Sequence, residues 1–73
     1  MINWIKGDVI DIWQANNKYF ILIDCQNLGY EIQILESFFL KLKSNKTSTK
    51  NVALWIKLIK KEDTDLLFGF SSR

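Results

Sequence analysis

The stretch VALWIKLIKKEDTDLLFGF, which runs from Val52 to Phe70, predicts a β-hairpin with a charged tip. Every second residue of its first half is aliphatic, which is the period of a strand that buries one face. Its second half is again apolar and aromatic. Where the halves meet, two lysines precede a cluster of three carboxylates, Glu62, Asp63 and Asp65. A solvated turn is the simple explanation for this cluster, and a functional role depends on what the rest of the chain is.

Three further segments carry strand patterns. The segment 4–13 alternates but contains Gly7, and a glycine inside a strand often marks a bulge or a bend where a barrel curls. The segment 18–25 is β-branched and aromatic, which predicts a strand buried on much of both faces. The segment 30–35 alternates between apolar and polar residues. Three strands therefore precede the hairpin.

One segment departs from this pattern. Residues 36–43, ESFFLKLK, predict a short helix with Ser37 as its N-cap, and Phe38, Phe39 and Leu42 on one face. The polar segment 44–51 predicts a surface loop. Three strands, a short helical turn and a closing hairpin form the order of an all-β, five-stranded OB-fold barrel, with room for a sixth strand. An SH3-like barrel is the competing fold.

Length and composition exclude several classes of protein. The chain has 73 residues, so we expect one domain, 1–73. With one cysteine and no histidine, it has no internal disulfide, no Cys/His zinc set and no histidine-based catalytic pair. Cys25 lies in an apolar strand beside Asp24, which favours a small core residue over a nucleophile. The acidic cluster lacks the glycine and distal glutamate of a calcium loop. We expect no enzymatic activity, no metal and no cofactor.

No part of the sequence suggests a membrane or export signal. No apolar run approaches the roughly 20 residues of a membrane helix. The start, MINWIKGDVID, carries charges that a signal peptide would not. A lone cysteine without an export signal is typical of the cytoplasm. We therefore expect a cytoplasmic protein without a membrane partner.

The lysines are unevenly distributed along the chain. Seven lysines and no acid lie between Ser37 and Lys61, whereas all eight acids lie outside that span. A surface of one sign favours a polyanionic partner, although lysines that merely solubilise a loop would give the same pattern.

Three tryptophans, Trp4, Trp13 and Trp55, also have two interpretations. We expect them to fill the barrel core or a subunit interface. Stacking on the bases of single-stranded DNA is the alternative.

Two motifs carry a resemblance to a known family. The stretch KKEDTDLLFGFSSR is similar to the end of the N-terminal domain of the RuvA family, which are bacterial Holliday-junction-binding proteins. The family typically shows a basic residue, Glu-Asp, two variable positions, Leu-Leu, an aromatic residue and Gly-Phe. The matching residues here are Lys61, Glu62, Asp63, Leu66, Leu67, Phe68, Gly69 and Phe70. LGYEIQI, from Leu28 to Ile34, resembles the V-G-Y-E-V strand of the family.

The start of the chain resembles the family as well, through Met1, Ile2 and Gly7, with Ile5 at a leucine position. The departures touch turns and the surface of the first strand. Asn3 and Trp4 stand where glycine and a basic residue are usual, and Gln26-Asn27 replaces a more glycine-rich turn. The loop 43–51 lacks the common proline and glycine.

The resemblance implies a site and a set of partners. Four copies would assemble around a four-fold axis, and the Glu62–Asp63 turns would meet there as an acidic pin under the crossover of a four-way DNA junction. Lys60 and Lys61 flank the pin and become candidate phosphate contacts. Whether Asp65 joins the pin depends on which way the turn faces.

The resemblance also implies a non-catalytic subunit of a helicase complex in branch migration, recombination, DNA repair and the SOS response to DNA damage. The RuvB motor, which is the ATPase, and the RuvC resolvase would be partners through the full-length protein. The helix-hairpin-helix motifs and the RuvB-binding domain of the family have no counterpart in this sequence, so we expect the first domain alone. A general single-strand-binding OB domain and a purely structural assembly module are the alternative functions.

Overall fold

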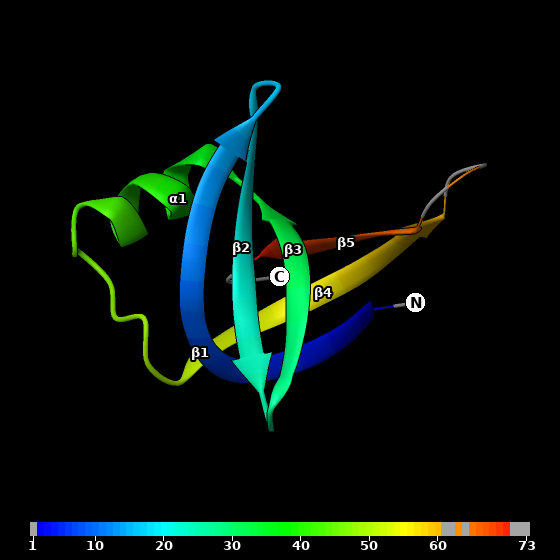
Figure 1. Ribbon diagram of the computed structural model, residues 1–73, viewed down its shortest axis with the longest axis horizontal. Coiled ribbons are helices and arrows are strands. Elements are labelled where there is room, and N and C mark those ends of the chain that lie inside the picture. Colours follow the sequence, from blue (N-terminus) through cyan, green and yellow to red (C-terminus); the bar gives the residue numbers. More distant parts are fainter. Residues whose placement is uncertain (1, 61–62, 64, 71–73) are drawn as a thin grey trace.

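The computed structural model describes residues 2–60, 63 and 65–70 (Figure 1). Five strands and one helix follow one another along these residues. They are β1 (Ile2–Ala15), β2 (Lys18–Cys25), β3 (Leu28–Ile34), α1 (Glu36–Lys43), β4 (Val52–Lys60) and β5 (Asp65–Phe70). The predicted order of strands, helix and hairpin is confirmed.

The strands form a closed barrel in the order β1-β2-β3-β5-β4. All neighbours are antiparallel except β3 and β5, which run parallel and meet at Gln33 and Phe68. β1 is shared between two partners. Its first half pairs with β4, and its second half pairs with β2. This is the all-β OB-fold barrel that the sequence predicts, and the described residues supply five strands.

β1 serves both partners because it bends sharply, as Figure 1 shows. A β-bulge shifts its register between Val9 and Asp11, so the bulge lies beyond Gly7, where the sequence pattern suggested one. Gly7 has a different role. A Cβ there would overlap the carbonyl oxygen of Asp24 and would lie 2.9 Å from its carbonyl carbon. Gly7 therefore lets the backbones of β1 and β2 approach closely where β1 passes from one partner to the other.

Two-residue turns connect the first three strands. Asn16 and Asn17 join β1 to β2 with φ angles of 51° and 62°, and Gln26 and Asn27 join β2 to β3 with 53° and 68°. Two consecutive positive φ angles are the requirement of a type I′ hairpin turn, whose twist matches that of the strands. Asparagine tolerates a positive φ angle better than most residues do. Glutamine does not share this preference, so Gln26 is the turn residue least suited to its backbone conformation.

The core is almost entirely aliphatic. Isoleucine and leucine side chains fill the barrel, and Ile21, Ile23, Ile32 and Leu54 are fully buried. From α1, Phe39 and Leu42 join this cluster and Phe38 packs against it, which confirms the predicted helix face. The buried hydrophobic residues in the described part of the chain are Ile5, Val9, Ile21, Ile23, Ile32, Ile34, Phe39, Leu42, Leu54 and Ile56.

The helix begins earlier than the sequence predicts. Its N-cap is Leu35, which makes no side-chain capping bond, so the assignment of Ser37 as N-cap is wrong. The helix follows β3 directly in the sequence, and a hydrogen bond connects its first turn to β2. The Tyr19 hydroxyl on β2 donates this bond, of 2.7 Å, to the Glu36 carboxylate. This hydrogen bond, then the loss of hydration and then repulsion by the Glu36 charge raise the pKa of Tyr19 above its usual value. Within the described part of the chain, no helix is long and apolar enough to cross a membrane.

Gly7→Ala tests the close approach of β1 and β2. The added methyl group would meet backbone atoms that cannot rotate away, so we expect the free energy of unfolding to fall by about 1–3 kcal/mol. Gly29→Ala is the matched control, because its Cβ would lie 3.4 Å from the Leu22 Cδ1 atom, in ordinary contact with a flexible side chain. Urea unfolding followed by circular dichroism measures both. Equal effects would contradict this role for Gly7.

Candidate nucleic-acid interface

Asp63 and Asp65, the described acids of the cluster, lie at the tip of the β4–β5 hairpin. The two strands are paired up to their ends, where Lys60 faces Asp65 across the hairpin. This end of the hairpin extends away from the other strands, as Figure 1 shows. Alternating aliphatic side chains that point into the barrel anchor the base of the hairpin, which leaves its tip free of the core.

Two of the four predicted site residues are described. Lys60 ends β4 and is exposed, and Asp63 is exposed in the turn. Glu62 and Lys61 lie outside the described residues. Asp65 begins β5 and is also exposed, so the structure brings it to the same tip.

Asp63 and Asp65, the described acids at the tip, are both exposed. Among the described residues, one ion pair is present, between Lys50 and Asp8, and it lies elsewhere. Asp63 and Asp65 therefore present their carboxylates to solvent. A hairpin that presents such charges can repel a nucleic-acid backbone.

The lysines do not form a single patch. Lys57 and Lys60 lie on β4, whereas Lys41 and Lys43 lie on α1 and Lys46 and Lys50 follow it in the connection to β4. Figure 1 shows α1 and this connection on the opposite side of the barrel from the hairpin tip. The described lysines between Ser37 and Lys61 therefore lie on two distant surfaces.

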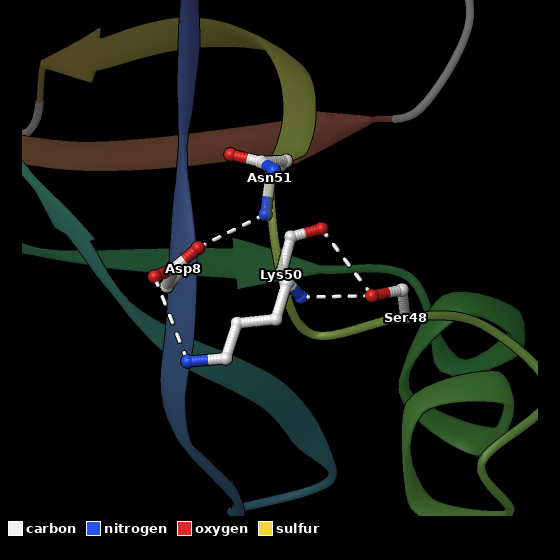
Figure 2. Close-up of polar contacts among 4 residues, drawn as sticks. All are labelled: Asp8, Ser48, Lys50 and Asn51. Atoms are coloured by element: carbon white, nitrogen blue, oxygen red, sulfur yellow. Dashed lines mark hydrogen bonds and ion pairs between the residues drawn. The ribbon is translucent and has the colours of Figure 1, made fainter.

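The connection before β4 is tied to β1 through Asp8, as Figure 2 shows. One carboxylate oxygen of Asp8 accepts a 2.9 Å hydrogen bond from the Asn51 backbone N–H, and the other lies 3.8 Å from Lys50 Nζ. The Val9 N–H also donates to the Thr49 carbonyl oxygen at 2.8 Å. The Ser48 hydroxyl oxygen accepts from the Lys50 N–H at 2.9 Å. The bulged part of β1 therefore positions this loop.

The tryptophans lie outside the barrel core. Trp4 is 55% exposed, and Trp13 and Trp55 are half-buried, so none of them fills the core. Their expected place in a subunit interface stays a prediction. Trp4 faces Trp55 across the β1–β4 pair. Trp13 lies far along β1, stacked on Phe20 with ring centroids 5.7 Å apart. A packed aliphatic interior this small leaves such large rings on its outer surface.

A cavity at one end of the barrel was not predicted from the sequence. Its volume is about 700 Å³, and every strand contributes to its lining. Cys25, which the sequence analysis assigned to the core, is half-buried and lines this cavity. Asn3 pairs with Ile56 and Tyr30 pairs with Ile23, and both isoleucines are buried in the core. Polar residues opposite core positions are the sequence signal that could have revealed the cavity.

The fold and the hairpin define an OB-fold domain with an acid-tipped closing hairpin. The family model described as the RuvA N terminal domain matches residues 1–69. The chain belongs to this family.

Curated relatives carry the same family name. The chain is 73% identical over 73 residues to the Holliday junction branch migration complex subunit RuvA of Prochlorococcus marinus strain AS9601. It is 71% identical over 72 residues to the protein of that name from strain MIT 9301, and 32% identical over 73 residues to that of Synechococcus sp. strain CC9311. The alignments cover 99–100% of this chain and 32% of each relative, so the chain spans about a third of their length.

The two contacts of Asp8 should contribute unequally to stability. Asp8→Ala removes the acceptor of the Asn51 N–H, so we expect the free energy of unfolding to fall by about 1 kcal/mol. Lys50→Ala removes only an ion pair whose side chains are 77% and 42% exposed, and we expect a loss below about 0.5 kcal/mol. Chemical denaturation measures both, and equal losses would contradict the hydrogen bond as the main contact.

Proposed function

We propose that this chain is the barrel domain of a non-catalytic, Holliday-junction-binding subunit that acts in branch migration and recombination. In this proposal four copies form the core of a homotetramer, and the turns with Glu62 and Asp63 meet near its axis as an acidic pin. The observation that carries the proposal is the hairpin that extends from the barrel and ends in exposed acids, Asp63 and Asp65. Membership of the family and the printed names of the relatives support it.

Repulsion is the mechanism by which the pin would act. Phosphates of the crossing strands avoid the carboxylates, so the strands leave the centre along separate paths rather than closing over it. One carboxylate–phosphate pair ~7 Å apart contributes only about 0.6 kcal/mol in water, and salt reduces this further. Two carboxylates from each of four copies add up to a term that selects junctions over plain duplex and regulates strand passage. They do not supply affinity.

Affinity would come from cations and backbone amides. Lys60 flanks the acidic tip and is exposed, and together with Lys61 it is our candidate for nearby phosphate contacts. Such contacts position the nucleic acid without reading its sequence. The RuvB motor, which supplies the ATPase, and the RuvC resolvase would act through the remainder of a longer protein in the cytoplasm.

Removing the negative charge of the pin tests this function. The host is a chimaera in which this chain replaces the matching residues of the Prochlorococcus marinus AS9601 relative. Glu62→Gln with Asp63→Asn should lower the ratio of junction affinity to duplex affinity by at least about threefold at low salt, because even one lost pair is worth about 0.6 kcal/mol. Electrophoretic mobility shifts across a salt series measure the ratio, and native mass spectrometry checks that the tetramer persists.

The control changes the same charge away from the tip. Asp11→Asn with Glu31→Gln neutralises two exposed acids on β1 and β3. If this control lowers the ratio as much as the pin variant, or if the pin variant leaves the ratio unchanged at every salt concentration, the pin has no role in junction selection.

The chain alone should bind junctions weakly. It covers about a third of its relatives' length, and in this proposal most of the phosphate contacts come from the remaining residues. We expect its dissociation constant for a four-way junction to exceed that of the chimaera by at least about a hundredfold, since each lost phosphate contact weakens binding. Fluorescence anisotropy with a labelled junction measures both, and nanomolar binding by the chain alone would contradict the expectation.

A further inference from the structure

The cavity at one end of the barrel lies apart from the acidic tip and has the features of a ligand site. It is open to solvent, and side chains of all five strands line it. They are Asn3 and Ile5 of β1, Cys25 of β2, Tyr30 of β3, Ile56 of β4 and Leu67 of β5. A volume of about 700 Å³ lies within the range of small-molecule sites, and the mouths of β-barrels are places where such sites occur. Of the described acids at the hairpin tip, neither Asp63 nor Asp65 lines it.

The apolar part of the lining suits a flat ring. Ile5 and Ile56 are nearly buried and form an aliphatic surface inside the mouth. Tyr30 contributes a half-buried aromatic ring, and Trp4 contributes a ring that is 55% exposed at the rim. Aromatic side chains bind heterocycles by stacking, which contributes about 1–3 kcal/mol per nucleobase in single-strand binders.

The polar part of the lining indicates which class of ligand the cavity suits. Three primary amides border the cavity, from Asn3, Gln26 and Asn51. An amide both donates and accepts hydrogen bonds, which complements the mixed edge of a nucleobase. All three residues are exposed, so their amides are accessible to a ligand.

The charge around the mouth favours an anion. Lys6 is exposed and lines the cavity, and no aspartate or glutamate is among the described residues that line it. A lysine at the edge of a site for a planar ring is suited to a phosphate attached to that ring through a sugar. A neutral apolar ligand would use neither Lys6 nor the amides.

We propose that the mouth of the barrel binds a nucleotide, with the base between the aliphatic floor and the aromatic rings, the amides on its edge, and Lys6 on its phosphate. The ligand is either a free mononucleotide or an unpaired nucleotide within a DNA strand, because both present the same groups. This inference does not depend on the acidic pin. A chain that failed the pin test could still bind a nucleotide here.

Cys25 offers a direct test, because it is the only cysteine in the chain and it lines the cavity. A nucleotide in the cavity should shield its thiol from N-ethylmaleimide. At a dTMP or dAMP concentration about ten times the dissociation constant, empty sites and therefore the alkylation rate should fall about tenfold. Mass spectrometry of the intact chain follows the reaction. 2-Deoxyribose 5-phosphate, which lacks the base, should not protect.

Variants at the mouth of the barrel test whether the proposed contacts cause the protection of the Cys25 thiol. Asn3→Ala with Lys6→Ala removes an amide and the cation, both exposed, and should raise the concentration needed for half-protection at least about tenfold. Gln14→Ala with Lys18→Ala, at the β1–β2 turn on the opposite end of the barrel, should leave it unchanged. Circular dichroism confirms that both variants fold.

Two DNA duplexes distinguish the sources of the ligand. One carries a single unpaired thymidine and the other is fully paired. Stronger protection by the first than by dTMP assigns the site to unpaired bases in DNA, and protection by mononucleotides alone assigns it to free nucleotides. No protection by any nucleotide at millimolar concentration overturns the proposal. Equal protection by the sugar phosphate, or an equal loss in the two variants, overturns it as well.

Discussion

The closure of the barrel depends on one strand that pairs with two partners. β1 pairs with β4 along its first half and with β2 along its second half, so it must turn without losing either set of hydrogen bonds. Gly7 permits this because its backbone lies against the Asp24 carbonyl group, where no side chain fits. The bulge between Val9 and Asp11 then shifts the register with β2 by one residue. Because β4 is held by the first half of β1, the position of the closing hairpin follows from this turn.

The same bend separates the charges of the molecule. The bulged part of β1 holds the segment before β4 through Asp8 and Val9, so the lysines that follow α1 stay on that side of the barrel. The hairpin carries its acids away in the opposite direction (Figure 1). With an ionic screening length of roughly 8 Å in physiological salt, two surfaces on opposite sides of a barrel act on a nucleic acid independently. The acidic tip therefore acts on its surroundings as a local charge, and the nearby Lys60 is the described cation closest to it along the strand.

Much of this architecture could be predicted from the sequence because the interior is aliphatic and the strands alternate. Leu54 and Ile56, for example, occupy alternate positions of β4 and are both buried. The acids were placed at a hairpin tip because apolar strands border them on both sides. The bulge, in contrast, depends on the register between β1 and β2, which no local pattern encodes. The N-cap at Leu35 lacks the side-chain capping bond that sequence patterns rely on, and the Tyr19–Glu36 hydrogen bond joins segments far apart in the sequence.

The aromatic rings and the cavity could not be predicted for a related reason. Hydrophobicity alone places a tryptophan inside, but the buried core of this barrel consists of aliphatic side chains and Phe39. The cavity requires inward residues from all five strands to converge at one end, which is a property of the closed barrel and not of any segment. Of the acidic tip, the position of Asp63 agrees with the sequence prediction, while Glu62 lies outside the described residues.

The outward position of the tryptophans has a consequence for optical measurements on this domain. None of the indole rings belongs to the buried core, so their emission in the folded state already reflects contact with water. Loss of the barrel therefore changes that emission less than it would in a protein whose indoles are buried, and far-ultraviolet dichroism is the better record of folding. Conversely, a molecule that settles on the outer surface alters the emission while the fold stays intact. In this domain, intrinsic fluorescence is a probe of association.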